Sequence, residues 1–191
     1  MKKVVRLTES DLTRIVRRVI EERSSKDYVM DILNNQGIKT AKEMFGSTEN
    51  IQNILGKEYL EKNLFSILKS KGIDFAISLV PDAEEFKRIL GVQTPMEFLH
   101  LFDDLTIKPY NDKRQMFIFY DNDGNALLSV SYYSGKFTEV HVYGHVIWRT
   151  LLEVFDIKNY KNEVQEMIGQ WLLDVYGIKA DRVSASGRVD S

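Results

Sequence analysis

Residues 115–143 read QMFIFYDNDGNALLSVSYYSGKFTEVHVY and give the clearest indication of the fold class. Three runs in it are rich in β-branched and aromatic residues with partial alternation: Gln115 to Tyr120, Ala126 to Tyr133 and Phe137 to Tyr143. Residues 121–125 (DNDGN) and 134–136 (SGK) separate these runs and are typical of tight hairpin turns. The stretch therefore predicts a three-stranded antiparallel meander, with Thr106 to Tyr110 as a fourth strand at the edge because it carries Pro109.

Two helices are expected on the C-terminal side of the meander, His145 to Phe155 and Asn162 to Tyr176. The second has apolar residues at helical spacing along one side: Val164, Met167, Ile168, Trp171, Leu172 and Val175. Gly177 is expected to end this helix. We expect residues 181–191 to form a polar tail with at most one short strand.

On the N-terminal side the chain is expected to be helical up to about Leu105, and it contains an internal repeat. Residues 37–56 (GIKTAKEMFGSTENIQNILG, the first copy) align without gaps on residues 72–91 (GIDFAISLVPDAEEFKRILG, the second copy). Each copy predicts a preceding helix that ends at its first glycine and a short segment closed by Gly46 or Pro81. A helix capped by Ser47 or Asp82 then follows. Two copies favour a duplicated helical unit over a longer repeat array.

We therefore expect an α+β protein with a helical N-terminal half, an antiparallel meander of three or four strands, and two C-terminal helices against the sheet. The expected parts are a leader at residues 1–22, a helical region at 26–105, the meander with its closing helices at 106–180, and the polar tail. A short polar hinge at residues 24–26 is expected to separate the leader from the helical region.

The composition excludes several classes of function. The chain has 191 residues and no cysteine, which rules out disulfides, thiolate metal sites and cysteine nucleophiles. No apolar run reaches the roughly 18 residues that a membrane span needs. Residues 1–24 hold seven basic and four acidic side chains, a net +3, which leaves −5 for the rest of a chain whose net charge is −2. A mildly acidic body is a poor binder of nucleic acid, so only the basic leader is suited to that role.

The chemical motifs are equally sparse. Residues 121–125 resemble the start of an EF-hand loop, but Tyr132 stands where that loop needs a glutamate, so we interpret them as a turn. His141 and His145 lack a third zinc ligand and a common helix face. We predict no catalytic residue, no metal ligand and no cofactor. If the chain is an enzyme, we expect its site where these two histidines and the meander face the last helix.

The leader predicts a basic amphipathic helix. Thr8 is a good N-cap residue, and an apolar leader stripe follows at helical spacing: Leu12, Ile15, Val16 and Val19. A helix of about fifteen residues is marginal alone in water, so we expect the leader stripe to dock on a protein surface. That surface is either a partner or the chain's own domain, since amphipathic helices often bury their apolar side at home.

The leader also carries a resemblance. Residues 4–16 (VVRLTESDLTRIV) resemble the leader shared by many uncharacterised proteins of large tailed bacteriophages, especially marine ones, and residues 147–176 are similar to the ends of uncharacterised phage proteins. In related phages such helices direct proteins into the prohead, and the head protease removes them after a Leu/Ile-x-Glu sequence. The resemblance implies a capsid-targeting peptide with a processing site at Ile20, Glu21, Glu22 and Arg23, cut between the last two.

Two functions follow as hypotheses. The first is a non-enzymatic virion-associated protein, an internal head or minor structural component, whose removable leader binds phage head or scaffold components. The alternative is a phage interaction protein outside the virion that binds and modulates a host protein, with the leader as a permanent docking helix. Both place the chain in the host bacterial cytoplasm, and the first also packages it into the virion.

Overall fold

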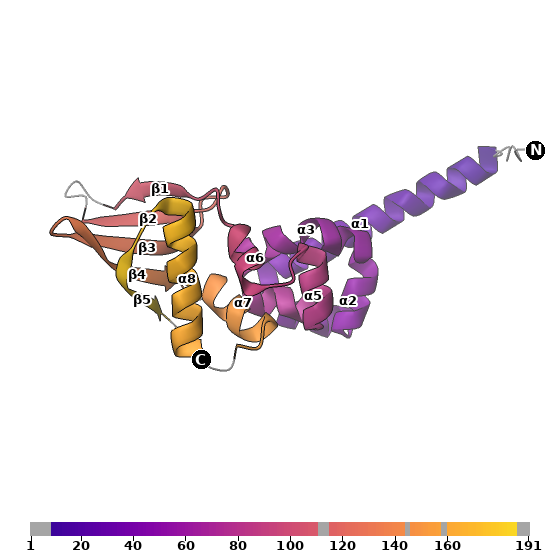
Figure 1. Cartoon of the computed structure of the whole chain (residues 1–191). Helices are drawn as coiled ribbons and strands as arrows, with labels where there is room; N and C mark the ends of the chain where they lie inside the picture. The colour runs from indigo at the N-terminus through magenta and orange to yellow at the C-terminus, as the bar shows by residue number, and fades with distance from the viewer. Residues whose placement is uncertain (1–8, 111–114, 144–145, 158–159, 187–191) are drawn as a thin grey trace, which may run out of the picture. The chain divides into compact units, whose positions relative to one another are not determined.

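A computed structural model describes residues 9–110, 115–143, 146–157 and 160–186, with side chains described from residue 25 onward and not for residues 160, 161 and 186. The chain forms two compact units, residues 1–60 and residues 61–191. The elements are labelled in Figure 1. The helices are α1 (Glu9–Phe45), α2 (Thr48–Leu55), α3 (Lys57–Lys71), α4 (Ile73–Leu79), α5 (Ala83–Leu90), α6 (Pro95–His100), α7 (Ile147–Val154) and α8 (Tyr160–Tyr176). The strands are β1 (Thr106–Pro109), β2 (Met116–Tyr120), β3 (Ala126–Tyr133), β4 (Lys136–Tyr143) and β5 (Ala180–Ser186).

The N-terminal half is helical, as predicted, and the two copies follow the same backbone course. Gly37 has φ 82° and ψ 174°, and Gly72 has φ 81° and ψ 175°. This conformation is essentially restricted to glycine, so both residues end one helix and start another in a new direction. Ser47 and Asp82 then cap α2 and α5, their side chains accepting hydrogen bonds from the backbone N–H groups of Asn50 and Glu85.

The expected hinge at residues 24–26 is not present as a break in the helix. α1 continues from Glu9 through these residues and changes direction only at Gly37. Each serine lowers the stability of a helix by roughly 0.5 kcal/mol relative to alanine. The helix-forming residues on either side offset this cost. The leader and the helix that precedes the first copy are thus one element. Val29, Ile32 and Leu33 of this helix are buried and form the α1 core stripe.

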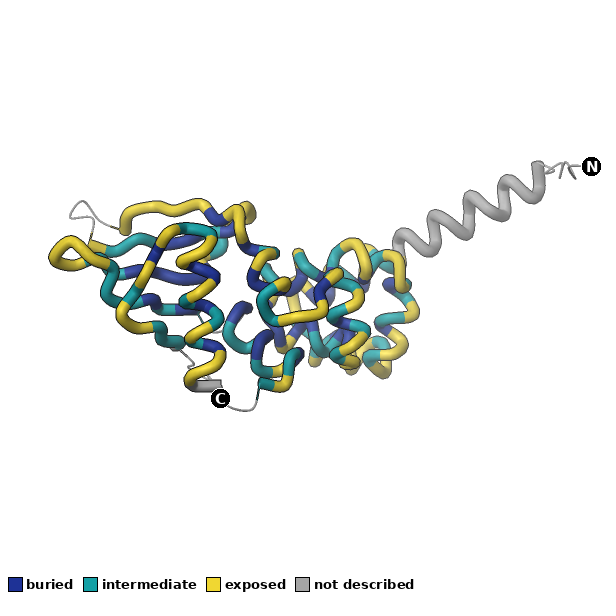
Figure 2. Tube along the Cα trace, in the orientation of Figure 1, coloured by how far each residue is buried: buried dark blue, intermediate teal, exposed yellow. Residues whose placement is uncertain are grey.

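The second unit is built on a five-stranded sheet in the order β1-β2-β3-β4-β5. The first four strands are antiparallel neighbours in sequence order, as the meander predicts. β1 is exposed along its whole length, and Figure 2 shows it as a yellow edge. Its Pro109 and Lys108 suit an edge, because proline and lysine discourage pairing with another chain.

The prediction of a purely antiparallel sheet is wrong, because β5 pairs in parallel with β4. The chain leaves β4, passes through α7 and α8, and returns to the same end of the sheet, and such a crossover produces a parallel neighbour. Residues 181–186, expected in a polar tail, form most of β5. Val183 supplies the apolar contact, since its Cγ2 lies 3.8 Å from where a Cβ on Gly169 of α8 would be.

α8 lies across one face of the sheet (Figure 1). Its buried residues repeat at helical spacing, as predicted from sequence: Val164, Ile168, Trp171 and Leu172. They share the core with Phe119, Val130 and Val140 from the strands. Phe119 meets the ring of Tyr176 edge-on, with ring centroids 5.3 Å apart. Burying such a side chain stabilises the fold by about 1.5–3 kcal/mol, so this layer holds the second unit together.

Candidate functional site

The predicted processing site, Ile20 to Arg23, lies inside α1. The side chains of these four residues, and those of the leader stripe, are outside the described residues. What the structure provides is the helical backbone that carries them. A bond inside a helix is a poor protease substrate, because cleavage favours exposed, irregular segments. Cleavage after Glu22 therefore requires local unwinding of α1.

The register of α1 separates the leader stripe from the α1 core stripe. An α-helix turns by about 100° per residue. On an ideal helix, the centre of the four leader-stripe positions is about 100° around the axis from the centre of the α1 core stripe. The leader stripe is therefore not a continuation of the side of α1 that packs on the first unit.

His141 does not face the last helix. The buried Val140 is paired with Val183, which lies beside Gly169 of α8, so Val140 is on the α8 side of the sheet. Side chains alternate along a strand, so His141 belongs to the opposite face. His145 lies outside the described residues. The two histidines are thus not shown to form a site, and the expectation that His141 faces α8 is wrong. The reason is the alternation of side chains along β4: the even-numbered residues face α8, and the odd-numbered ones face away from it.

His141 belongs to a row of hydrogen bonds across β4 and β5. Its Nδ1 lies 3.2 Å from the Ser184 hydroxyl, and that hydroxyl lies 3.0 Å from Glu139 Oε1. The same hydroxyl also lies 3.3 Å from the Val140 carbonyl, so Ser184 links three groups of β4. These contacts tie β5 to β4 through side chains as well as through the backbone ladder.

A second polar cluster joins the end of α6 to α8. Asp103 accepts hydrogen bonds from Trp171 Nε1 and His100 Nδ1, both at 2.9 Å. Tyr176 donates to the Phe102 carbonyl at 2.8 Å and accepts from the Leu105 N–H. Burial raises the pKa of the Tyr176 phenol, the Leu105 N–H lowers it, and the carboxylates of Asp103 and Asp104 raise it further. The phenol stays protonated, and the cluster holds α8 against the chain that enters the sheet.

Residues 121–125 form the predicted hairpin turn and not a calcium loop. The buried carboxylate of Asp121 accepts from the backbone N–H groups of Asp123 and Asn125 at 3.0 and 2.8 Å, so it points at the turn itself. Asp123 pairs with Lys69 of α3 at 2.8 Å. Within the part of the chain that the structure describes, no three histidine or acidic side chains are placed to hold a metal ion.

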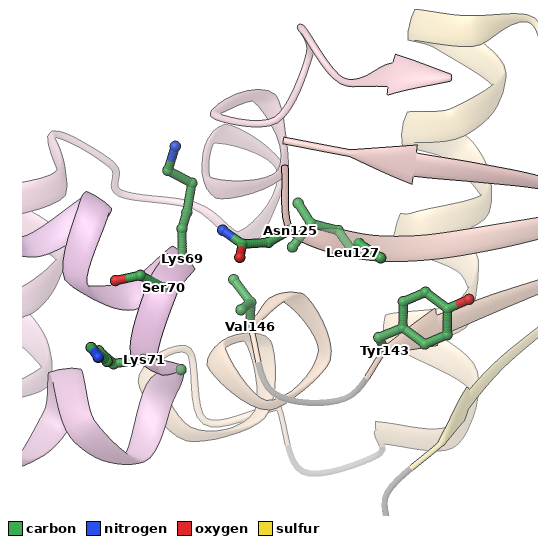
Figure 3. Close-up of a pocket in the computed structure, with 9 residues that line it drawn as sticks. Lys69, Ser70, Lys71, Asn125, Leu127, Tyr143 and Val146 are labelled. Atoms are coloured by element: carbon green, nitrogen blue, oxygen red, sulfur yellow. The ribbon is translucent and has the colours of Figure 1, made fainter. Parts of the chain in front are cut away.

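A cavity of about 270 Å³ lies between the end of α3, the start of β3 and the start of α7 (Figure 3). Three of its polar side chains bind groups elsewhere: Lys69 pairs with Asp123, the Ser70 hydroxyl donates to the Ser66 carbonyl at 2.8 Å, and the Asn125 amide donates to Asp121 at 3.0 Å. Leu127 and Val146 add apolar walls. The arrangement lacks the convergent polar groups of a ligand site, and we assign no chemistry to it.

Among the described residues, no helix has the length and apolar character that crossing a bilayer requires. Neither models of protein families, nor curated proteins, nor solved structures match this chain.

Proposed function

We propose that this chain is a non-enzymatic, virion-associated binding protein of a large tailed phage, an internal head or minor structural component. Its N-terminal helix docks it on a head or scaffold protein of the particle. The resemblance of the leader to phage leaders supports the phage origin. The register of α1 is the observation that supports docking through the leader. The positions of the leader stripe are turned by about 100° from those of the α1 core stripe on an ideal helix, which supports a separate docking surface for the leader. The host bacterial cytoplasm is then the place of synthesis and the virion the destination.

A second candidate gains support from the unbroken helix. If the leader were joined by a flexible hinge, a head protease would find an accessible bond after Glu22. Because α1 continues through residues 20–26, the leader suits a permanent docking helix at least as well. In that case the chain acts outside the virion and binds a host protein through the leader stripe, by laying an amphipathic helix into an apolar groove.

The docking step is tested with two double variants of the full chain, Leu12→Gln with Val16→Gln and, as a matched control, Arg14→Gln with Arg17→Gln. The first removes half of the leader stripe, and the second removes polar residues from the other side of the same helix. We expect the first to lose incorporation into particles and the second to keep it, with both unfolding near the wild-type temperature. A drop of several degrees for the first variant alone would mean that the stripe packs on the chain's own domain.

The two candidates are separated by the particle itself. Mass spectrometry of purified virions should find the chain if it is virion-associated, with an N-terminal peptide that begins at Arg23 if the leader is removed. Glu22→Ala should then leave the leader attached. Absence from purified particles, together with leader-dependent binding to a host protein, would favour the second candidate.

A further inference from the structure

We draw no further inference here: the strongest candidate, the face of the sheet opposite α8 on which Ser129, His141 and Tyr143 lie, carries none because nothing in the described part of the chain shows what covers it.

Discussion

The first copy (residues 37–56) and the second copy (residues 72–91) share their local backbone geometry but differ in how far their side chains are buried. Both turn at a glycine with φ near 80° and ψ near 175°, and both cap their last helix with a side chain. They differ in burial, since the apolar residues of α4 are buried and those of its counterpart, residues 38–45, are partly exposed. Local sequence thus sets the backbone conformation of each copy, while the burial of its side chains depends on other parts of the chain.

The largest expected effect tests this difference directly. Leu79→Ala should lower the free energy of unfolding by about 2–5 kcal/mol, because it empties a fully buried site. Met44→Ala, at the matching position, should change it by less than about 0.5 kcal/mol. Both tryptophans, Trp148 and Trp171, lie in the unit formed by residues 61–191, so their fluorescence in urea reports the Leu79 variant. Far-UV circular dichroism reports both, and equal losses would abolish the distinction.

The next effect concerns what the copies share. Gly37→Ala and Gly72→Ala should each cost about 1–3 kcal/mol, since alanine is strained at this backbone conformation. At Gly37 an added Cβ meets no atom within 4 Å, so its cost is purely conformational, while Gly72 is buried and should lie at the upper end. Gly169→Ala in α8 is the control, because φ there is helical and alanine should stabilise the helix. Thermal unfolding measures all three, and a neutral Gly37→Ala would contradict the shared geometry.

Helix caps give a smaller effect that should be equal in the two copies. Ser47 accepts from the Asn50 N–H at 3.1 Å, and Asp82 accepts from the Glu85 N–H at 2.7 Å. Ser47→Ala and Asp82→Ala should each cost about 1 kcal/mol. Amide hydrogen exchange should speed up at Asn50 in the first variant and at Glu85 in the second, and in neither case at both.

The smallest effect is that of the ion pair between Asp74 of α4 and Arg149 of α7, which marks the second copy. The Asp74 side chain is 71 % exposed, so Arg149→Met should cost about 0–1 kcal/mol in spite of the bidentate contact. A double-mutant cycle with Asp74→Asn measures the coupling, and added salt should reduce it. A coupling of several kcal/mol would show that this exposed pair holds α7 in place, contrary to the expectation.

The parts predicted from sequence are those that local chemistry decides. The glycines, caps and turn residues fix the helical half and the meander, since each acts on its own few neighbours. For the C-terminal tail the sequence allowed at most one short strand, and the parallel pairing of β5 with β4 was missed because ADRVSAS has little apolar alternation and pairs only with the free edge of β4. The continuity of α1 was missed because a polar segment with two serines, taken by itself, suggests a hinge, whereas the residues on both sides keep it helical. The polar contacts of His141, Asp103 and Arg149 depend on partners 43 to 75 positions away.

The late arrival of β5 has a consequence for how the protein is made. His141 and Ser184 sit side by side although they are 43 positions apart, so β4 leaves the ribosome well before its neighbour exists. Until then an eight-residue strand presents unpaired N–H and C=O groups to the cell, and slow, non-local pairing of this kind exposes a chain to aggregation. Pausing of translation or early termination between residues 143 and 180 should therefore harm solubility more than comparable interruptions after residue 186. A ribosome-bound series of increasing length would reveal that window.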